Sequence, residues 1–252
     1  MLTDTSKGGR VKINTLLYRG VLALSMVILS SCTSPASSTV AGQEPAHSAK
    51  SHLPGNGVPI INPALAHIGE ELYKQNCVFC HQADAIGRPG VAPSLTNKEF
   101  LSVASDKFLY ATIHDGRMGT GMPPFAHLSD EKIKGIIAFL RAHAKLPSRS
   151  DEVDKQEQAN GDPRLGSIWF HQICSTCHGP EGDGYSAGGT GTAIGKAGFL
   201  DKSSDGFIRV TIKEGRSNTR MLPFQGSEAM ADLSDREIDD IIAYLRTVPS
   251  KN

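Results

Sequence analysis

The sequence has no long apolar run. Its longest, VLALSMVIL from Val21 to Leu29, holds nine residues. At about 1.5 Å per residue, such a helix falls well short of the ~30 Å of hydrocarbon in a membrane. The sequence also lacks an excess of either charge, since 26 Lys and Arg balance 26 Asp and Glu. No basic stripe of the kind that binds nucleic acid is present. Both a membrane-spanning and a nucleic-acid-binding protein are therefore disfavoured.

The short apolar run has the context of an export signal, because basic residues precede it. It ends in Leu29-Ser30-Ser31-Cys32, which resembles a bacterial lipoprotein box, where the cysteine is lipidated and becomes the new N-terminus. We therefore expect a signal peptide over residues 1–31 and a lipid anchor at Cys32, on the periplasmic side of a bacterial membrane. An ordinary signal peptide followed by an unrelated cysteine is the alternative.

The segment after Cys32 is poor in large apolar residues. Residues 32–57 are rich in Ser, Ala, Pro and Gly, which predicts a disordered tether. Four of the 26 basic residues and one of the 26 acidic residues lie in the first 31 positions, so the rest of the chain has 22 basic and 25 acidic residues, a net charge of −3. This modest charge predicts a modest salt dependence of partner binding.

Cysteine is scarce, and its placement is informative. Four of the five cysteines lie in two frames, CVFCH (Cys77 to His81) and CSTCH (Cys174 to His178). Four cysteines in an exported protein normally form two disulfides. Here they come as two close pairs, each followed at once by a histidine, and this pattern indicates a cofactor site.

The chemistry of the frame follows from its spacing. Positions i, i+3 and i+4 of a helix share one face, so two thiols and one imidazole project toward the same object. CxxCH is the signature of c-type haem attachment, with two thioether bonds and a histidine on the iron. A zinc site is an alternative, but it needs a fourth ligand and a less awkward spacing. A thioredoxin-like redox pair would need a βαβ context, which is missing. The predicted cofactors are two covalently bound haem c groups.

The two frames belong to an internal repeat. Each repeat is about 90 residues long and holds one frame, so each is expected to be a domain. The predicted boundaries are 58–147 and 163–252, with a charged linker over 148–162. Three aligned pairs define the repeat: HIGEELYKQNCVFCH (67–81) with RLGSIWFHQICSTCH (164–178), FLSVASDKFLYATIHDGR (100–117) with FLDKSSDGFIRVTIKEGR (199–216), and LSDEKIKGIIAFLR (128–141) with LSDREIDDIIAYLR (233–246).

The expected fold is all-α, because no segment shows sustained period-two alternation. Residues 65–80 and 165–177 read as helices that lead into the two frames. Ser129 and Ser234 are predicted N-caps of the last helix of each domain, and Ser234 with Glu237 fits a capping box. Apolar residues recur at helical spacing in both last helices: Ile133, Ile136, Ile137 and Leu140, and Ile238, Ile241, Ile242 and Leu245.

With these motifs in place, residues 64–250 resemble two tandem class I cytochrome c domains nearly end to end. In that family an N-terminal helix carries CxxCH and crosses a C-terminal helix through a glycine–aromatic contact. The residues that match this contact are Gly69, Tyr73 and Phe139 in the first domain, and Gly166, Phe170 and Tyr244 in the second.

The resemblance also implies a sixth iron ligand, usually a methionine on the loop before the last helix. GRMGTGMPPF (116–125) aligns with GRSNTRMLPF (215–224), which places Met122 opposite Met221, whereas Met118 faces Ser217. The implied iron ligands are therefore His81 and Met122 in one domain and His178 and Met221 in the other, with the haems attached at Cys77, Cys80, Cys174 and Cys177. The histidines outside the frames, His67, His114, His127, His143 and His171, have no matched position in both repeats and are expected at the surface.

Two further features come from the family pattern. Members usually have a proline whose carbonyl accepts the N–H of the iron-binding histidine, and Pro93 fits. Thr192 stands at that position in the second domain, so another group is expected to orient His178. Arg117 and Arg216 match across the repeats and could neutralise haem propionates, with ordinary solvated arginines as the alternative.

The expected function is electron transfer and not catalysis. The resemblance implies a membrane-anchored dihaem cytochrome that passes single electrons between a respiratory or dehydrogenase complex and a periplasmic or membrane partner. One alternative is a haem-bearing subunit of an oxidoreductase or terminal oxidase. A dihaem peroxidase-type enzyme is the other, although two loop methionines disfavour the open iron position that it needs. A thiosulfate-oxidising dihaem protein would need a cysteine ligand, which this chain lacks.

Overall fold

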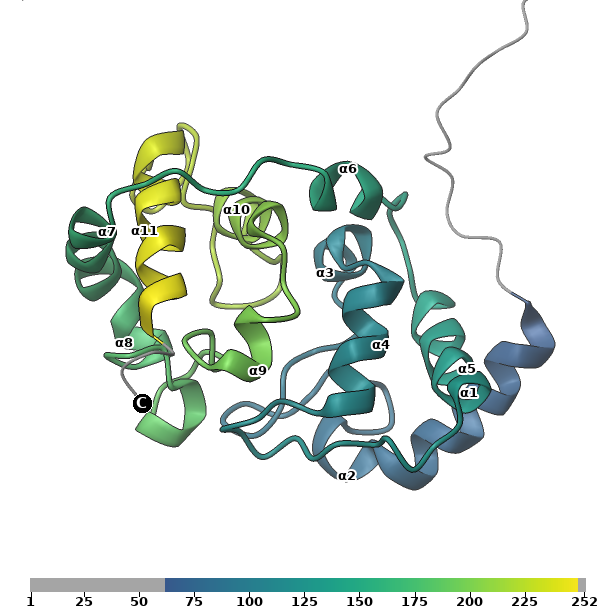
Figure 1. The fold of residues 1–252 in the computed structure, drawn as a ribbon. Helices are drawn as coiled ribbons and strands as arrows, with labels where there is room; N and C mark the ends of the chain where they lie inside the picture. The colour runs from purple at the N-terminus through teal and green to yellow at the C-terminus, as the bar shows by residue number, and fades with distance from the viewer. Residues whose placement is uncertain (1–61, 249–252) are drawn as a thin grey trace, which may run out of the picture. The chain divides into compact units, whose positions relative to one another are not determined.

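The computed structural model describes residues 62–248 (Figure 1). The predicted signal peptide, the tether and Cys32 lie outside these residues. Every regular element in the described part is a helix, and the one β-type pairing there is an isolated bridge between Arg88 and Ala92. The prediction of an all-α fold is confirmed for residues 62–248.

Corresponding helices follow in the same order in the two repeats. The first repeat contains α1 (Pro63–Asn76), α2 (Val78–His81), α3 (Lys98–Val103), α4 (Asp106–Asp115) and α5 (Asp130–Arg141). The second contains α7 (Pro163–Trp169), the π-helix η1 (Phe170–Cys174), α8 (Ser175–His178), the 3₁₀-helix η2 (Gly184–Ala187), α9 (Ala197–Leu200), α10 (Asp205–Glu214) and α11 (Asp235–Thr247). Between them lies α6 (Ser150–Asp154), so the segment predicted as a linker includes one helical turn.

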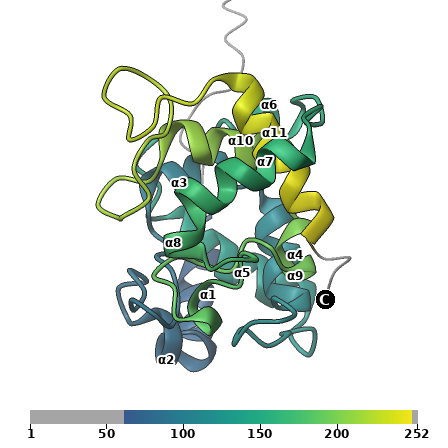
Figure 2. The same cartoon turned by 90° about the vertical axis from the view of Figure 1, so that its left-hand side faces the viewer.

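The first and last helices of each repeat pack against each other, α1 on α5 and α7 on α11 (Figures 1 and 2). The helical spacing of the apolar residues explains this packing, because Ile133, Ile136 and Leu140 are at most 2% exposed, and so are Ile238, Ile241 and Ile242. Complete burial of one such side chain contributes about 1.5–3 kcal/mol. The apolar face of the last helix in each repeat is thus the main wall of that repeat's core.

A glycine lets the two helices of each pair touch. A Cβ added to Gly69 would lie 1.8 Å from the carbonyl oxygen of Gly135, and one added to Gly166 would lie 1.8 Å from that of Asp240. Aromatic rings meet beside both contacts: the centroids of Tyr73 and Phe139 are 5.0 Å apart, and those of Phe170 and Tyr244 are 5.3 Å apart. The expected glycine–aromatic crossing is present in both repeats.

The predicted caps differ between the repeats. Ser234 and Glu237 form the expected capping box on α11. Ser129 is the N-cap residue of α5, as predicted, but its side chain makes no capping hydrogen bond. The third residue of α5 is Lys132, which cannot reach back to the cap nitrogen as a Glu does.

The helices that lead into the two frames are interrupted, whereas the sequence predicted continuous ones. Helix α1 ends at Asn76, Cys77 follows with φ −117°, and α2 begins at Val78. In the second repeat the five residues of η1 separate α7 from α8. Insertions of this kind in a helix are frequent at functional sites, where they re-aim side chains.

In each domain, one arginine of the last helix donates hydrogen bonds to main-chain carbonyls in the middle of the domain. The sequence analysis did not predict this feature. Arg141 donates to the carbonyl oxygens of Leu101 and Ala104, at 2.5 and 2.6 Å, and its Nε donates to Asp106. Arg246 makes the matching set with Leu200, Ser203 and Asp205. The alignment of the repeats already places Arg141 opposite Arg246, but it does not reveal that both side chains donate hydrogen bonds to main-chain carbonyls.

Candidate functional site

Each frame places its histidine ring in a fixed orientation. The Nδ1 atom of His81 lies 3.0 Å from the carbonyl oxygen of Pro93, as the sequence predicted. In the second repeat Nδ1 of His178 lies 2.7 Å from the carbonyl oxygen of Thr192. A carbonyl can only accept, so Nδ1 carries the proton and Nε2 is left with a free lone pair. This is the arrangement that a metal-binding histidine needs.

The expectation that His178 is oriented by a different kind of group is therefore wrong. The main-chain carbonyl at the aligned position does the same work whether the residue is Pro93 or Thr192. The glycines beside Thr192 have a related purpose, since a Cβ on Gly191 would lie 2.7 Å from the His178 ring. The loop GTGTAI (189–194) thus packs directly on the imidazole, and its small residues make that approach feasible.

No disulfide joins the four frame cysteines in the described residues, so all four sulfurs are available to a cofactor. Cys77 and Cys174 pack against the hydrophobic core. Burial raises the pKa of Cys77 to about 11 and that of Cys174 to about 12, so both are protonated thiols at neutral pH. Burial likewise lowers the pKa of His81 and of His178, which keeps both imidazoles neutral. A neutral imidazole is the form that ligates iron.

The two predicted ligand methionines lie on loops of matching geometry. The N–H of Arg117 donates to the carbonyl of Met122 at 3.0 Å, and the N–H of Arg216 donates to that of Met221 at 2.7 Å. The N–H of Met122 donates to the hydroxyl oxygen of Thr120 at 3.2 Å, and the N–H of Met221 donates to that of Thr219 at 3.0 Å. Both methionines are partly buried, whereas Met118 is 77% exposed. Within the first loop, Met118 is therefore more exposed to solvent than Met122.

The histidines outside the frames are not gathered into a site. His67, His127 and His171 are exposed, and His114 and His143 are partly buried and bonded locally, to Asp115 and to the carbonyl of Phe139. Within residues 62–248 no group of three His, Cys, Asp or Glu side chains is arranged to hold a metal ion. In the same residues, no helix combines the length and the apolar character that crossing a membrane requires.

Arg117 and Arg216 are not solvated side chains. The guanidinium carbon of Arg117 lies 4.9 Å from the ring centroid of Phe199, and that of Arg216 lies 4.9 Å from the ring centroid of Phe100. Each arginine therefore contacts the opposite repeat. Burial lowers the pKa of both to about 10, so they keep their charge at neutral pH.

The residues present fit a covalently attached haem. Thiols at i and i+3 stand beside a neutral histidine whose Nδ1 is already occupied by a carbonyl, and the set occurs twice with the same hydrogen bonds. A porphyrin supplies four nitrogen ligands itself, so the protein needs to supply only the axial ones. Buried guanidinium groups next to the methionine loops suit the carboxylates that such a cofactor carries.

Comparison with known proteins agrees with this assignment. A protein-family model described as "Cytochrome C oxidase, cbb3-type, subunit III" matches residues 64–140, and one described as "Cytochrome c" matches residues 164–249. The two matches correspond to the two repeats.

Several known proteins are similar to this chain over part of their length. The chain is 32% identical over 186 residues to the "Cbb3-type cytochrome c oxidase subunit CcoP" of Rubrivivax gelatinosus, a match that covers 73% of this chain and 55% of the relative. It is 28% identical over 138 residues to the corresponding subunit FixP of Sinorhizobium medicae, covering 50% and 44%. The "Cytochrome bc1 complex cytochrome c subunit" of Mycobacterium leprae is 27% identical over 202 residues, covering 73% and 62%. The chain thus spans about half the length of the first of these relatives.

Proposed function

Since this chain contains two cytochrome c-type domains in tandem, with two covalently bound haem c groups, we propose that it transfers single electrons as the haem-bearing subunit of a respiratory complex. The observation that carries the proposal is the pair of CxxCH frames, each with its histidine held by a carbonyl at the same position of the repeat. We take the domain boundaries to be 58–147 and 163–252.

In this proposal the protein residues attach, orient and shield the haems. Cys77 and Cys80 form the thioethers of the first haem, and Cys174 and Cys177 those of the second. His81 and His178 would hold the iron on one side through Nε2, and the carbonyls of Pro93 and Thr192 fix the two rings. The iron supplies the one-electron redox change.

Met122 and Met221 are proposed as the ligands on the other side of the two irons. Their loops share a main-chain bond from the preceding arginine and a threonine cap, so both sulfurs are presented by a defined backbone and not by a flexible one. A thioether ligand favours the reduced iron relative to a second histidine and raises the reduction potential. A histidine and a methionine on each iron would leave no position for a substrate, which suits electron transfer more than catalysis.

The partner class is proposed from the relatives. A subunit of a cbb3-type cytochrome c oxidase and a cytochrome c subunit of a bc1 complex are among the similar proteins. A subunit of such a complex therefore suits this chain better than a free shuttle. Export and a lipid anchor at Cys32 would hold it at the periplasmic side of a membrane, where a respiratory complex could exchange electrons with it.

Co-purification tests this proposal. The full chain with a C-terminal tag is isolated from membranes of its own host in mild detergent, and the product is separated on a native gel and stained for haem. We expect the haem stain to migrate with a larger assembly that contains other subunits. A matched Cys32→Ser chain should keep two haems but leave the membrane fraction. A tagged wild-type chain that always migrates alone would point to a free shuttle instead.

A further inference from the structure

The two repeats meet through contacts that are reciprocal. Arg117 of the first repeat lies over Phe199 of the second, and Arg216 of the second lies over Phe100 of the first, both at 4.9 Å. Arg117 aligns with Arg216, and Phe100 with Phe199. This is the pattern of a two-fold interface, in which residue i contacts j and j contacts i. The repeats are thus packed like the subunits of a symmetric dimer within one chain.

A cluster of four phenylalanines occupies the centre of this interface. Phe108 and its counterpart Phe207 stack on each other with ring centroids 4.8 Å apart. Edge contacts complete the pattern, from Phe108 to Phe199 and from Phe207 to Phe100, both at 6.3 Å. These rings are at most 9% exposed, so the two guanidinium groups beside them lie in a water-poor environment.

In the described residues, the positive charges of the two guanidinium groups are not balanced by salt bridges. Nε of Arg117 is buried and has no hydrogen-bond partner, while Nη2 donates to the carbonyl oxygen of Ala193 at 2.6 Å. Neither arginine has a salt bridge in the part of the chain that the structure describes. The guanidinium carbon of Arg216 also lies 5.9 Å from the ring centroid of Phe207. That centroid is 6.3 Å from the centroid of Phe199, the ring under Arg117, so both cations lie on the same aromatic cluster.

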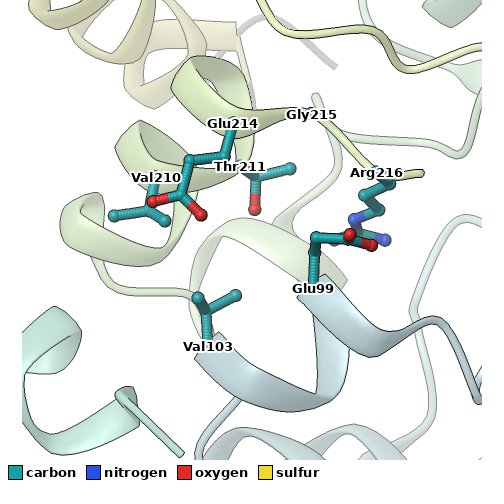
Figure 3. Close-up of a pocket in the computed structure, with 7 residues that line it drawn as sticks. All are labelled: Glu99, Val103, Val210, Thr211, Glu214, Gly215 and Arg216. Atoms are coloured by element: carbon teal, nitrogen blue, oxygen red, sulfur yellow. The ribbon is translucent and has the colours of Figure 1, made fainter. Parts of the chain in front are cut away.

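One carboxylate approaches this pair. Glu99 lies beside Arg216, and both line the small pocket between α3 and α10 that is drawn in Figure 3. Its oxygen Oε2 already accepts the N–H and hydroxyl of Ser217, at 3.2 and 2.9 Å. The residue that aligns with Glu99 is Gly198, so Arg117 has no equivalent acid. The pair of cations has this one acid, beside Arg216, so a further anion would be stabilised there, because an unpaired buried charge is costly.

The arginine pair is also built into both haem sites. Each arginine directly precedes its methionine loop and donates a main-chain bond to Met122 or Met221. Arg117 further reaches Ala193, whose neighbour Thr192 holds the iron-binding histidine of the other repeat. One pair of cations therefore touches the ligand loops of both domains.

We infer that Arg117 and Arg216 form one shared anion site that holds haem propionate carboxylates at the interface and thereby couples the two haems electrostatically. This inference rests on the proposed electron-transfer function. Reduction adds one electron, and hence one negative charge, to a haem, and a nearby guanidinium stabilises that added charge. Removal of either arginine should lower both reduction potentials, because each cation serves both haems.

A redox titration of the full haem-loaded protein, followed optically and fitted to two one-electron steps, tests this inference. We expect Arg117→Gln and Arg216→Gln each to lower both midpoint potentials, the larger shift reaching a tenfold change in the redox equilibrium, which is 59 mV for one electron. Arg117→Lys should recover part of the loss. Arg88→Gln and Arg236→Gln, which remove exposed arginines, should leave both potentials unchanged.

The outcomes are separable. Potentials in Arg117→Gln, Arg216→Gln and Arg117→Lys that match the wild type would overturn the inference, and so would a shift confined to one haem in each variant. Wild-type potentials that depend on the concentration of inorganic phosphate would assign the site to a solute anion and would also overturn it. Haem content is measured in each sample, and only samples with two haems are compared. Failure to co-purify with a complex would count against the proposed function and leave these potentials unaffected.

Discussion

At the scale of single residues, the proposal that Met122 and Met221 are iron ligands implies that they close the irons to small ligands. Met122→Ala and Met221→Ala should each remove about half of the far-red Fe–S absorbance and let the reduced protein bind carbon monoxide at one haem, because an axial position opens. Optical spectra with and without carbon monoxide measure this. Met118→Ala serves as the control, since Met118 is 77% exposed and should leave the spectrum unchanged. Carbon monoxide binding to the reduced wild type would instead favour an enzyme.

A second residue-scale prediction concerns acid stability. The Arg164 side chain, with help from the Arg164 N–H, holds the pKa of Asp162 at about 2, below its ordinary value of 3.8. A carboxyl whose pKa is depressed on folding stabilises the protein above the ordinary value, and this contribution is lost as the pH falls from about 4 toward 2. Asp162→Asn keeps a capping residue on α7 but should remove this part of the pH dependence.

Urea unfolding at pH 5 and pH 2.5 measures the effect. The loss of stability between these two pH values should be smaller in Asp162→Asn than in the wild type. Asn62 provides the control, because it caps α1 with a neutral side chain whose oxygen accepts the N–H groups of Ala64 and Leu65. Asn62→Ala should lower stability by a similar amount at both pH values. Equal pH dependence in Asp162→Asn and the wild type would contradict the assignment.

At the scale of helices, the crossing of α1 and α5 should tolerate a side chain at Gly135 but not at Gly69. Gly69→Ala would place a Cβ 1.8 Å from the carbonyl oxygen of Gly135, so the helices must separate. We expect a loss of at least about 2 kcal/mol, as for other overpacked contacts. On an open helix the same change would stabilise by about 1 kcal/mol, so the expected sign is the opposite of helix propensity.

The opposing glycine is the matched control. A Cβ on Gly135 meets its nearest neighbours, in Gly69 and Leu65, at 3.5 Å, which is ordinary contact. Gly135→Ala should therefore be neutral or slightly stabilising. Thermal unfolding of both variants, with two haems attached, compares them. A Gly69→Ala protein as stable as the wild type would mean that the helices cross at a greater distance than the structure shows.

At the scale of the whole described molecule, the phenylalanine cluster should make the two repeats unfold together. Phe108→Ala and Phe207→Ala each remove a buried ring and should cost about 3–5 kcal/mol. Because the two rings stack at 4.8 Å, the double variant should cost less than the sum, with a coupling of about 0.5–3 kcal/mol. Denaturant unfolding of the four proteins gives the cycle.

Phe79→Ala is the control for ring removal, since Phe79 is 87% exposed and should change the free energy of unfolding by less than about 0.5 kcal/mol. Additive changes in the free energy of unfolding at Phe108 and Phe207 would show that the two rings are not coupled across the interface. Two separate unfolding transitions in either single variant, with one in the wild type, would support an interface that holds the domains in one cooperative unit.

Sequence patterns alone predicted the helical class, the repeat and the chemistry of the two frames. Covalent spacing is local: a thiol pair at i and i+3 with histidine at i+4 is readable wherever it occurs. The 3.6-residue period fixed the buried face of α5 and α11, and the alignment singled out Met122 over Met118. The glycine crossing was readable as well, because Gly69 and Gly166 recur at matched positions.

Features that depend on main-chain groups or on contacts between distant residues became visible only in the folded structure. The main-chain carbonyl of Thr192 orients His178 in the same way as that of Pro93 orients His81. The residue type does not reveal this role, because every residue has a main-chain carbonyl. The hydrogen bonds from Arg141 and Arg246 to main-chain carbonyls were hidden for the same reason. The reciprocal interface was equally invisible, since no sequence pattern tells whether Arg117 faces water or a ring 82 positions away, at Phe199. Packing brings those groups together, and only packing sets the low dielectric in which their charge matters.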